Sequence, residues 1–142
     1  MNEAMNEQDS KACGRAGVQG WLGLAFWMSF GLLFETLMAY RAPSYLEDGE
    51  RRELFRLAHA HGSAFGFLLV AASLWVNARR VKLARLSWRA LRAGTVLMPF
   101  GFLFAGVWHP EGDPGLAIWL VPIGAIALVF GLISVALTRK AR

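Results

Sequence analysis

Four apolar runs, each long enough to cross a lipid bilayer, constrain this chain more than any other feature of its sequence. We place these runs at Val18–Tyr40, Leu54–Val76, Leu91–Trp108 and Leu116–Leu137. A bilayer-spanning helix needs about 20 apolar residues, and a helix satisfies all its backbone hydrogen bonds within one segment. Little of the 142-residue chain remains beyond tails and short loops. The sequence therefore predicts an all-α, polytopic membrane protein with four transmembrane helices in an up-down-up-down bundle.

The remaining residues divide the chain into two tails around one transmembrane domain. We expect a polar, loosely ordered cytoplasmic tail at 1–16, the four-helix domain at 17–138 and a basic cytoplasmic tail at 139–142. A basic connector at 76–92 joins the second and third spans, and a short amphipathic helix is one form that it could take. The first apolar run is too long for a secretory signal peptide, and Cys13 has no disulfide partner because it is the single cysteine.

The positive charges are unevenly distributed between the two predicted sides of the membrane. Most of the 15 Lys and Arg residues fall in the tails and the connector: Lys11, Arg15, Arg79, Arg80, Lys82, Arg85, Arg89, Arg92, Arg139, Lys140 and Arg142. An excess of Lys and Arg marks cytoplasmic segments, so we expect both termini in the cytoplasm of a bacterium and the spans in its inner membrane. The connector would then lie against anionic lipid headgroups. Because this sorting accounts for the net charge of +5, we expect no nucleic-acid partner.

Ionisable residues near the span ends are the candidates for function, because such residues are costly in a membrane. His59 and His61 open the second span, His109 ends the third, and Glu35 lies roughly 7 Å inside the outer end of the first. The topology brings all four to the outer ends of the helices. Imidazole suits Zn, Cu and haem iron. We therefore predict a metal site formed by Glu35, His59, His61 and His109, or a b-type haem bound by His59, His61 or His109, for redox chemistry or assembly of a respiratory complex.

Helical periodicity separates the two neighbouring histidines. His59 shares a small, polar face with Ser63 and Gly66, whereas His61 points about 200° away and is expected to meet a different neighbour. His59 is thus the better candidate for the interior. Glu35 and His59 lie at similar depth on consecutive helices, so we expect them to be hydrogen-bonded partners.

Each candidate also has a structural interpretation. His59 could be an interior histidine bonded to Glu35 or Ser63, His61 an interfacial residue, His109 a marker of the headgroup boundary, and Glu35 a carboxylate that reaches the headgroups. The sequence has no zinc-ligand His-Glu-x-x-His helix, c-type haem motif or phosphate loop. Two other functions therefore stay open: a non-catalytic membrane subunit or scaffold, and a small proton-coupled transporter. The expected partners are the lipid bilayer and either another membrane subunit or a second copy.

Two resemblances to known families involve these residues. The run 55–62, Phe-Arg-Leu-Ala-His-Ala-His-Gly, resembles an Ala-His-Ala-His-Gly pattern in uncharacterised small bacterial four-helix membrane proteins. It also resembles helix two of the haem–copper oxidase catalytic subunits, where an Arg-x-x-His stretch supplies a haem ligand. That resemblance implies His59, three residues after Arg56, as the ligand position of a haem- or metal-binding fragment. By analogy with small multidrug-resistance transporters, Glu35 would be the essential glutamate of the first span, although theirs sits near mid-membrane.

Glycines recur along the predicted spans. Gly17, Gly20 and Gly23 open the first span, and small residues at such positions let neighbouring helices approach closely. We expect Gly31, Gly66 and Gly131 to face neighbouring helices as well.

The charge distribution predicts which loops are accessible from outside. Single cysteines placed at residues 41–53 or 110–115 should react with an impermeant thiol reagent on intact spheroplasts, because both loops are predicted to be external. Cysteines in the connector should react only after lysis. If only the connector is labelled on intact spheroplasts, the protein has the opposite orientation in the membrane.

Overall fold

The computed structural model describes residues 7–108 and 113–138, and helices are the only regular elements in these ranges. The long helices are α1 (Glu7–Ala39), α3 (Gly49–Arg79), α4 (Arg85–Val107) and α5 (Leu120–Leu137). A one-turn helix, α2 (Pro43–Leu46), and a 3-10 helix, η1 (Leu116–Trp119), lie in the connections. Within the described ranges, four helical segments are long and apolar enough to cross a membrane: Asp9–Ala39, Gly49–Arg79, Arg85–Val107 and Leu116–Leu137. The prediction of an all-α protein with four membrane-spanning helices is confirmed.

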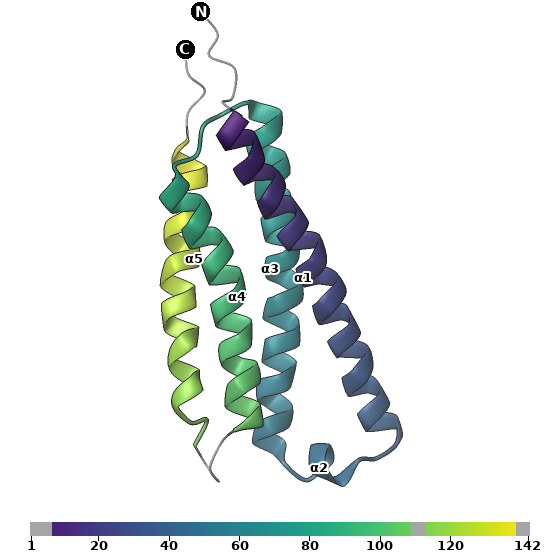
Figure 1. The fold of residues 1–142 in the computed structure, drawn as a ribbon. Coiled ribbons are helices and arrows are strands. Elements are labelled where there is room, and N and C mark those ends of the chain that lie inside the picture. Colours follow the sequence, from purple (N-terminus) through teal and green to yellow (C-terminus); the bar gives the residue numbers. More distant parts are fainter. Residues whose placement is uncertain (1–6, 109–112, 139–142) are drawn as a thin grey trace, which may run out of the picture.

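The long helices lie side by side in the order α1, α3, α4, α5, and this open row leaves α1 and α5 at its two edges (Figure 1). Each packs mainly against the long helices that neighbour it in the chain, whereas α1 touches α4 only lightly. The start of α1 and the end of α5 lie at the same end of the molecule (Figure 1). Aliphatic and aromatic side chains remain exposed along the outer helices, including Leu22, Met28 and Leu32 on α1 and Ile126 on α5. Such surfaces suit contact with lipid.

Glycines bring α1 and α3 close together. A Cβ atom added at Gly20 would lie 2.9 Å from the Gly66 carbonyl oxygen, and one at Gly17 would lie 3.1 Å from the Ser73 hydroxyl. Gly31 faces the ring of His59 in the same way. Rising residue numbers on α1 therefore meet falling numbers on α3, so this pair is antiparallel. The expected contacts of Gly31 and Gly66 are confirmed.

The contact between α4 and α5 is closer still, because it joins backbone to backbone. A Cβ at Gly94 would lie 2.7 Å from both the Gly124 oxygen and the Leu128 nitrogen, and one at Gly124 would lie 2.6 Å from the Met98 nitrogen. Gly131 packs against Leu91, as expected. Side chains larger than hydrogen have no space at these positions, which is how membrane helices gain van der Waals contact without a hydrophobic driving force.

The helices extend further than the apolar runs predict. Residues 7–16, expected to belong to a loosely ordered tail, form the first turns of α1, where Cys13 and Ala16 are buried. The Cys13 thiol donates a hydrogen bond to the Ser73 carbonyl oxygen at 3.0 Å. Hydropathy misses these turns because polar residues sustain a helix equally well where it leaves the hydrocarbon.

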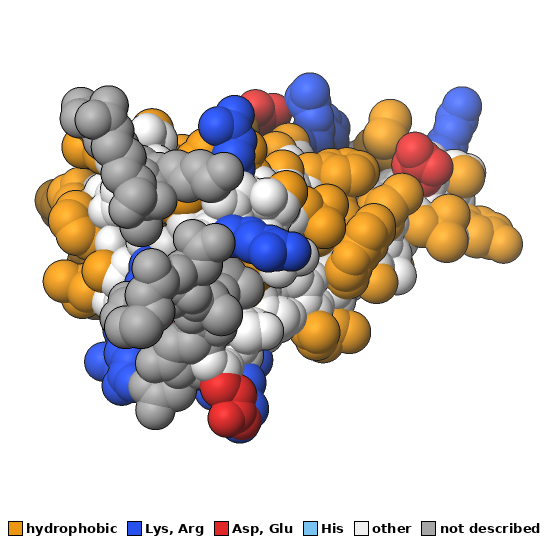
Figure 2. Space-filling model, turned by 90° about the horizontal axis from the view of Figure 1, so that it is seen from above, with side chains coloured by type: hydrophobic (Ala, Val, Ile, Leu, Met, Phe, Trp, Pro, Cys, Tyr) orange, Lys and Arg blue, Asp and Glu red, His pale blue; other side chains and the backbone are white. Residues whose placement is uncertain are grey.

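The basic connector is shorter than predicted and holds no helix of its own. Most of residues 76–92 belong to the ends of α3 and α4, with Arg80 in the left-handed conformation that ends α3. Val81 and Leu83 are buried, which anchors the turn against the bundle. We call this end of the molecule, where α1 and α4 begin, the basic end. Viewed toward it, Lys and Arg side chains stand among exposed hydrophobic ones (Figure 2).

The α4–α5 contact generates a stability prediction with a matched control. Gly94→Ala should lower the thermal unfolding midpoint in detergent, because displacing two backbones costs about 1–3 kcal/mol, like other overpacked substitutions. Gly23→Ala should not lower it, since no atom lies within 4 Å of a Cβ added there. Both changes carry the same gain in helix propensity. Equal midpoints for the two variants would show that the α4–α5 contact is looser than described.

Candidate functional site

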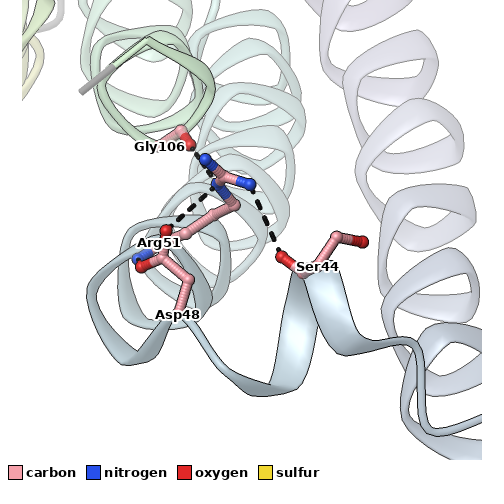
Figure 3. A network of polar contacts seen from close by, with 4 residues as sticks. All are labelled: Ser44, Asp48, Arg51 and Gly106. Carbon is pink, nitrogen blue, oxygen red and sulfur yellow. Dashed lines mark hydrogen bonds and ion pairs between the residues drawn. The ribbon is translucent and has the colours of Figure 1, made fainter. Parts of the chain in front are cut away.

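A polar network fixes the start of α3, the helix that carries both described histidines. The Asp48 carboxylate accepts a hydrogen bond from the Arg51 backbone N–H at 2.9 Å and caps the helix, as such residues commonly do. The Arg51 guanidinium donates to the Gly106 carbonyl oxygen near the end of α4 at 3.1 Å (Figure 3). It also lies 3.5 Å from the Ser44 carbonyl oxygen in α2. One side chain thus ties α2, α3 and α4 together, two turns before His59.

His59 is held against α1 by a hydrogen bond to backbone. Its Nδ1 lies 2.7 Å from the carbonyl oxygen of Trp27. A carbonyl oxygen only accepts hydrogen bonds, so Nδ1 must carry the proton and the neutral ring keeps its lone pair on Nε2. The half-buried ring faces Gly31, where any side chain would overlap it. The geometry therefore fixes both the orientation and the tautomer of His59.

Aromatic residues surround this contact. Trp27 is buried, and its indole packs over Gly62, one turn after His59. The rings of Phe30 and Phe100 lie edge-on to that indole, at centroid distances of 5.6 Å and 5.3 Å. These rings form an apolar cluster around Trp27, the residue whose carbonyl oxygen accepts the hydrogen bond from His59.

His61 faces a different helix, as its spacing from His59 predicts. Its Nδ1 lies 2.8 Å from the Leu57 carbonyl oxygen of its own helix, so this ring also keeps the lone pair on Nε2. The ring packs against Phe102 of α4 at 5.1 Å and against Phe65 at 5.6 Å. The two imidazoles therefore belong to separate interfaces, His59 with α1 and His61 with α4.

The structure describes three of the four predicted metal ligands, and it does not bring Glu35, His59 and His61 together. Glu35 is exposed on α1 and makes no hydrogen bond or ion pair within residues 7–108 and 113–138, so the expected bond to His59 is not made there. His109 lies outside the described residues. Within the described ranges no group of three or more His, Cys, Asp or Glu side chains could hold a metal ion.

One hydroxyl close to His59 has no partner. The Ser63 Oγ, one turn along the same face of α3, is buried and makes no hydrogen bond to the described part of the chain. Buried hydroxyls nearly always have a partner, so this atom marks a place where a further polar group would be favourable.

A second polar cluster, which the sequence analysis missed, joins α1 to α4. The Arg92 Nε donates to Gln19 Oε1 at 2.6 Å, and Gln19 Nε2 donates to the Arg92 carbonyl oxygen at 2.9 Å. The same amide lies 3.3 Å from the buried Thr95 hydroxyl. The sequence does contain an indication of this cluster, because Gln19 is a polar amide within the first apolar run.

No family model, curated protein or solved structure matches this chain. The feature that offers most chemistry is the pair of imidazoles with Nδ1 bound to a backbone carbonyl, because the lone pair on Nε2 of such a neutral ring can bind a metal.

The hydrogen bond at His59 predicts a measurable tautomer. At a pH where both rings are neutral, side-chain ¹⁵N spectra should show Nδ1 protonated in His59 and in His61. Gly31→Ala should displace the His59 ring and change its signals, while those of His61 stay the same. A His59 protonated at Nε2 would show that the bond to Trp27 is absent.

Proposed function

We propose that this integral membrane protein binds a b-type haem near the ends of its helices, with Nε2 of His59 as the iron ligand. The observation that carries the proposal is the 2.7 Å hydrogen bond between His59 Nδ1 and the Trp27 carbonyl oxygen. Metal-ligating histidines almost always donate their other ring N–H to a carbonyl or carboxylate, which fixes the ring and raises its basicity.

The donors present suit a haem better than a metal ion bound by protein alone. A closed site for Zn or Cu takes three or four protein ligands, and the described residues assemble no such group. A haem brings its own equatorial nitrogens and takes only one or two axial side chains. His59 would provide one, and His61, on the other face of α3, is not placed to share the same iron. His109 remains a candidate for the second.

The surroundings of His59 fit a bound cofactor in two further respects. The unpartnered Ser63 hydroxyl offers a hydrogen bond to a polar edge of the group. The rings of Trp27, Phe30 and Phe100 form an apolar cluster beside the histidine. When bound, a haem supplies one-electron transfer, and the contribution of the chain is to orient Nε2 and to exclude water. Redox chemistry or assembly of a respiratory complex would use such a site.

The charge distribution supports an orientation in the membrane. Lys and Arg are concentrated in the predicted tails and around the turn between α3 and α4. We therefore place the basic end and both termini in the cytoplasm, and the histidines toward the outer face of a bacterial inner membrane.

Glu35 favours a second candidate, a non-catalytic membrane subunit. Its carboxylate is exposed near the end of α1 and has no partner within the described chain, and α1 packs against its neighbours along one side. A carboxylate in a span is normally paired inside a larger assembly or near water. A neighbouring subunit or a second copy could supply the partner.

Absorption spectra of protein purified in mild detergent from haem-replete cells distinguish these candidates. The unaltered protein should carry haem, and His59→Ala should abolish it because the iron loses its ligand. His61→Ala is the matched control and should retain haem. It removes a histidine of the same tautomer, only two residues from His59.

Two outcomes would contradict the haem proposal. A full complement of haem in the His59→Ala protein would remove the ligand role of that residue. Unaltered protein without chromophore or iron would instead favour the subunit, and Glu35→Gln should then weaken its co-purification with a partner.

A further inference from the structure

Two adjoining cavities open between α1 and α4, the pair of long helices that touch only lightly. One has a volume of about 710 Å³ and the other about 390 Å³. They share Lys11, Arg15 and Arg92 in their walls, so they form a single groove. Neither described histidine lines this groove, although its deep end reaches Trp27, whose carbonyl oxygen accepts the hydrogen bond from His59.

The larger cavity is apolar for most of its length. One wall is formed by Val18, Leu22 and Phe26 of α1, and the other by Val96 and Phe100 of α4. The floor is the glycine-rich face of α3, with Gly62, Gly66 and Leu69. The stretch from Val18 to Phe26 extends about 12 Å at the helical rise. That length approaches the thickness of one hydrocarbon leaflet, about 15 Å.

The smaller cavity is strongly basic. Around Trp88 and Ala12, it is lined by five cationic side chains: Lys11, Arg15, Arg85, Arg89 and Arg92. No described acidic residue lines either cavity, although Lys11 forms an exposed ion pair with Glu7. The first turn of α4 begins here without a side-chain cap, which adds partial positive charge from the helix dipole.

The Gln19 cluster lies where the two cavities meet. Gln19 Oε1 holds Arg92 Nε at 2.6 Å, so the guanidinium is fixed at the junction between the basic and apolar parts. A guanidinium has further N–H donors in a fork that matches phosphate oxygens.

We propose that this groove binds one anionic phospholipid, with its phosphate among the cationic side chains of the basic cavity and an acyl chain between α1 and α4. Both walls change from cationic to apolar with distance from the basic end, from Arg15 to Val18 on α1 and from Arg92 to Val96 on α4. Only an amphiphile matches that pattern. Basic pockets between membrane helices are typical binding sites for such headgroups.

The test is a titration of the delipidated full-length chain in detergent with phosphatidylglycerol or phosphatidylcholine, followed by native mass spectrometry. One phosphatidylglycerol should bind, and phosphatidylcholine at least about tenfold more weakly, because its headgroup carries no net charge. The double variant Arg15→Gln/Arg89→Gln should weaken binding by roughly fivefold or more for each charge removed. Arg79→Gln, an exposed Arg of α3 outside both cavities, is the charge-matched control and should bind normally.

A second variant tests the acyl chain. Gly23 lines the apolar cavity, and a Cβ there meets no atom within 4 Å. Gly23→Phe should therefore fill the groove without disturbing helix packing, and should weaken phosphatidylglycerol binding at an unchanged unfolding midpoint. If this variant unfolds early, the arginine variants still decide the question, since their side chains are exposed.

Three results would overturn the proposal. Equal losses in Arg79→Gln and in the double variant would indicate diffuse surface attraction. Equal affinity for phosphatidylcholine would remove the role of the basic cavity. Inorganic phosphate that competes as well as the lipid would identify a free-anion site rather than a lipid site.

Discussion

The structure depends on places where one helix presents bare backbone to another. Inside a membrane, apolar side chains gain little by leaving lipid, so helices associate through close van der Waals contact. Gly20 with Gly66, and Gly94 with Gly124, let whole backbones meet in two pairs of neighbouring helices. The same feature builds the candidate site, because the His59 ring occupies the space that Gly31 leaves. The same kind of small residue therefore serves both the packing of the helices and the position of the His59 ring, so a larger side chain at Gly31 would disturb both.

The sequence predicts the number and position of the spans well, because long apolar runs have few alternatives. The Asp48 cap is a local feature as well, since the acceptor and the Arg51 N–H lie three residues apart in the chain. The sequence does not predict the open row of helices. Hydropathy reports that a face avoids water, but a face buried against lipid and a face buried against protein look alike. Hydropathy also did not predict the first turns of α1, which begins at Glu7, because the helix continues where its residues become polar.

The candidate site was predicted in part. Helical spacing separates His59 from His61, and the structure gives them different neighbours on α1 and α4. The hydrogen-bond acceptor of His59 could not be predicted, because it is the backbone carbonyl of Trp27. Every residue has such a carbonyl, so the residue type does not indicate which one accepts the bond. A carboxylate at similar depth was the visible alternative, yet Glu35 faces outward. Depth along an antiparallel pair can be counted from sequence, but rotation about the helix axis depends on packing.

The row of helices has a consequence for how the chain folds as it is made. The long helices pack mainly against long helices next to them in the chain, so nearly all contacts between long helices join neighbours in the sequence. Such local topologies fold quickly, because little loop entropy is lost before contacts form. Both helices of the α1–α3 pair are present once Arg79 has been synthesised, after which α4 can pack on α3 and α5 on α4. No helix has to wait for a distant partner, so few apolar surfaces stay unpaired during insertion.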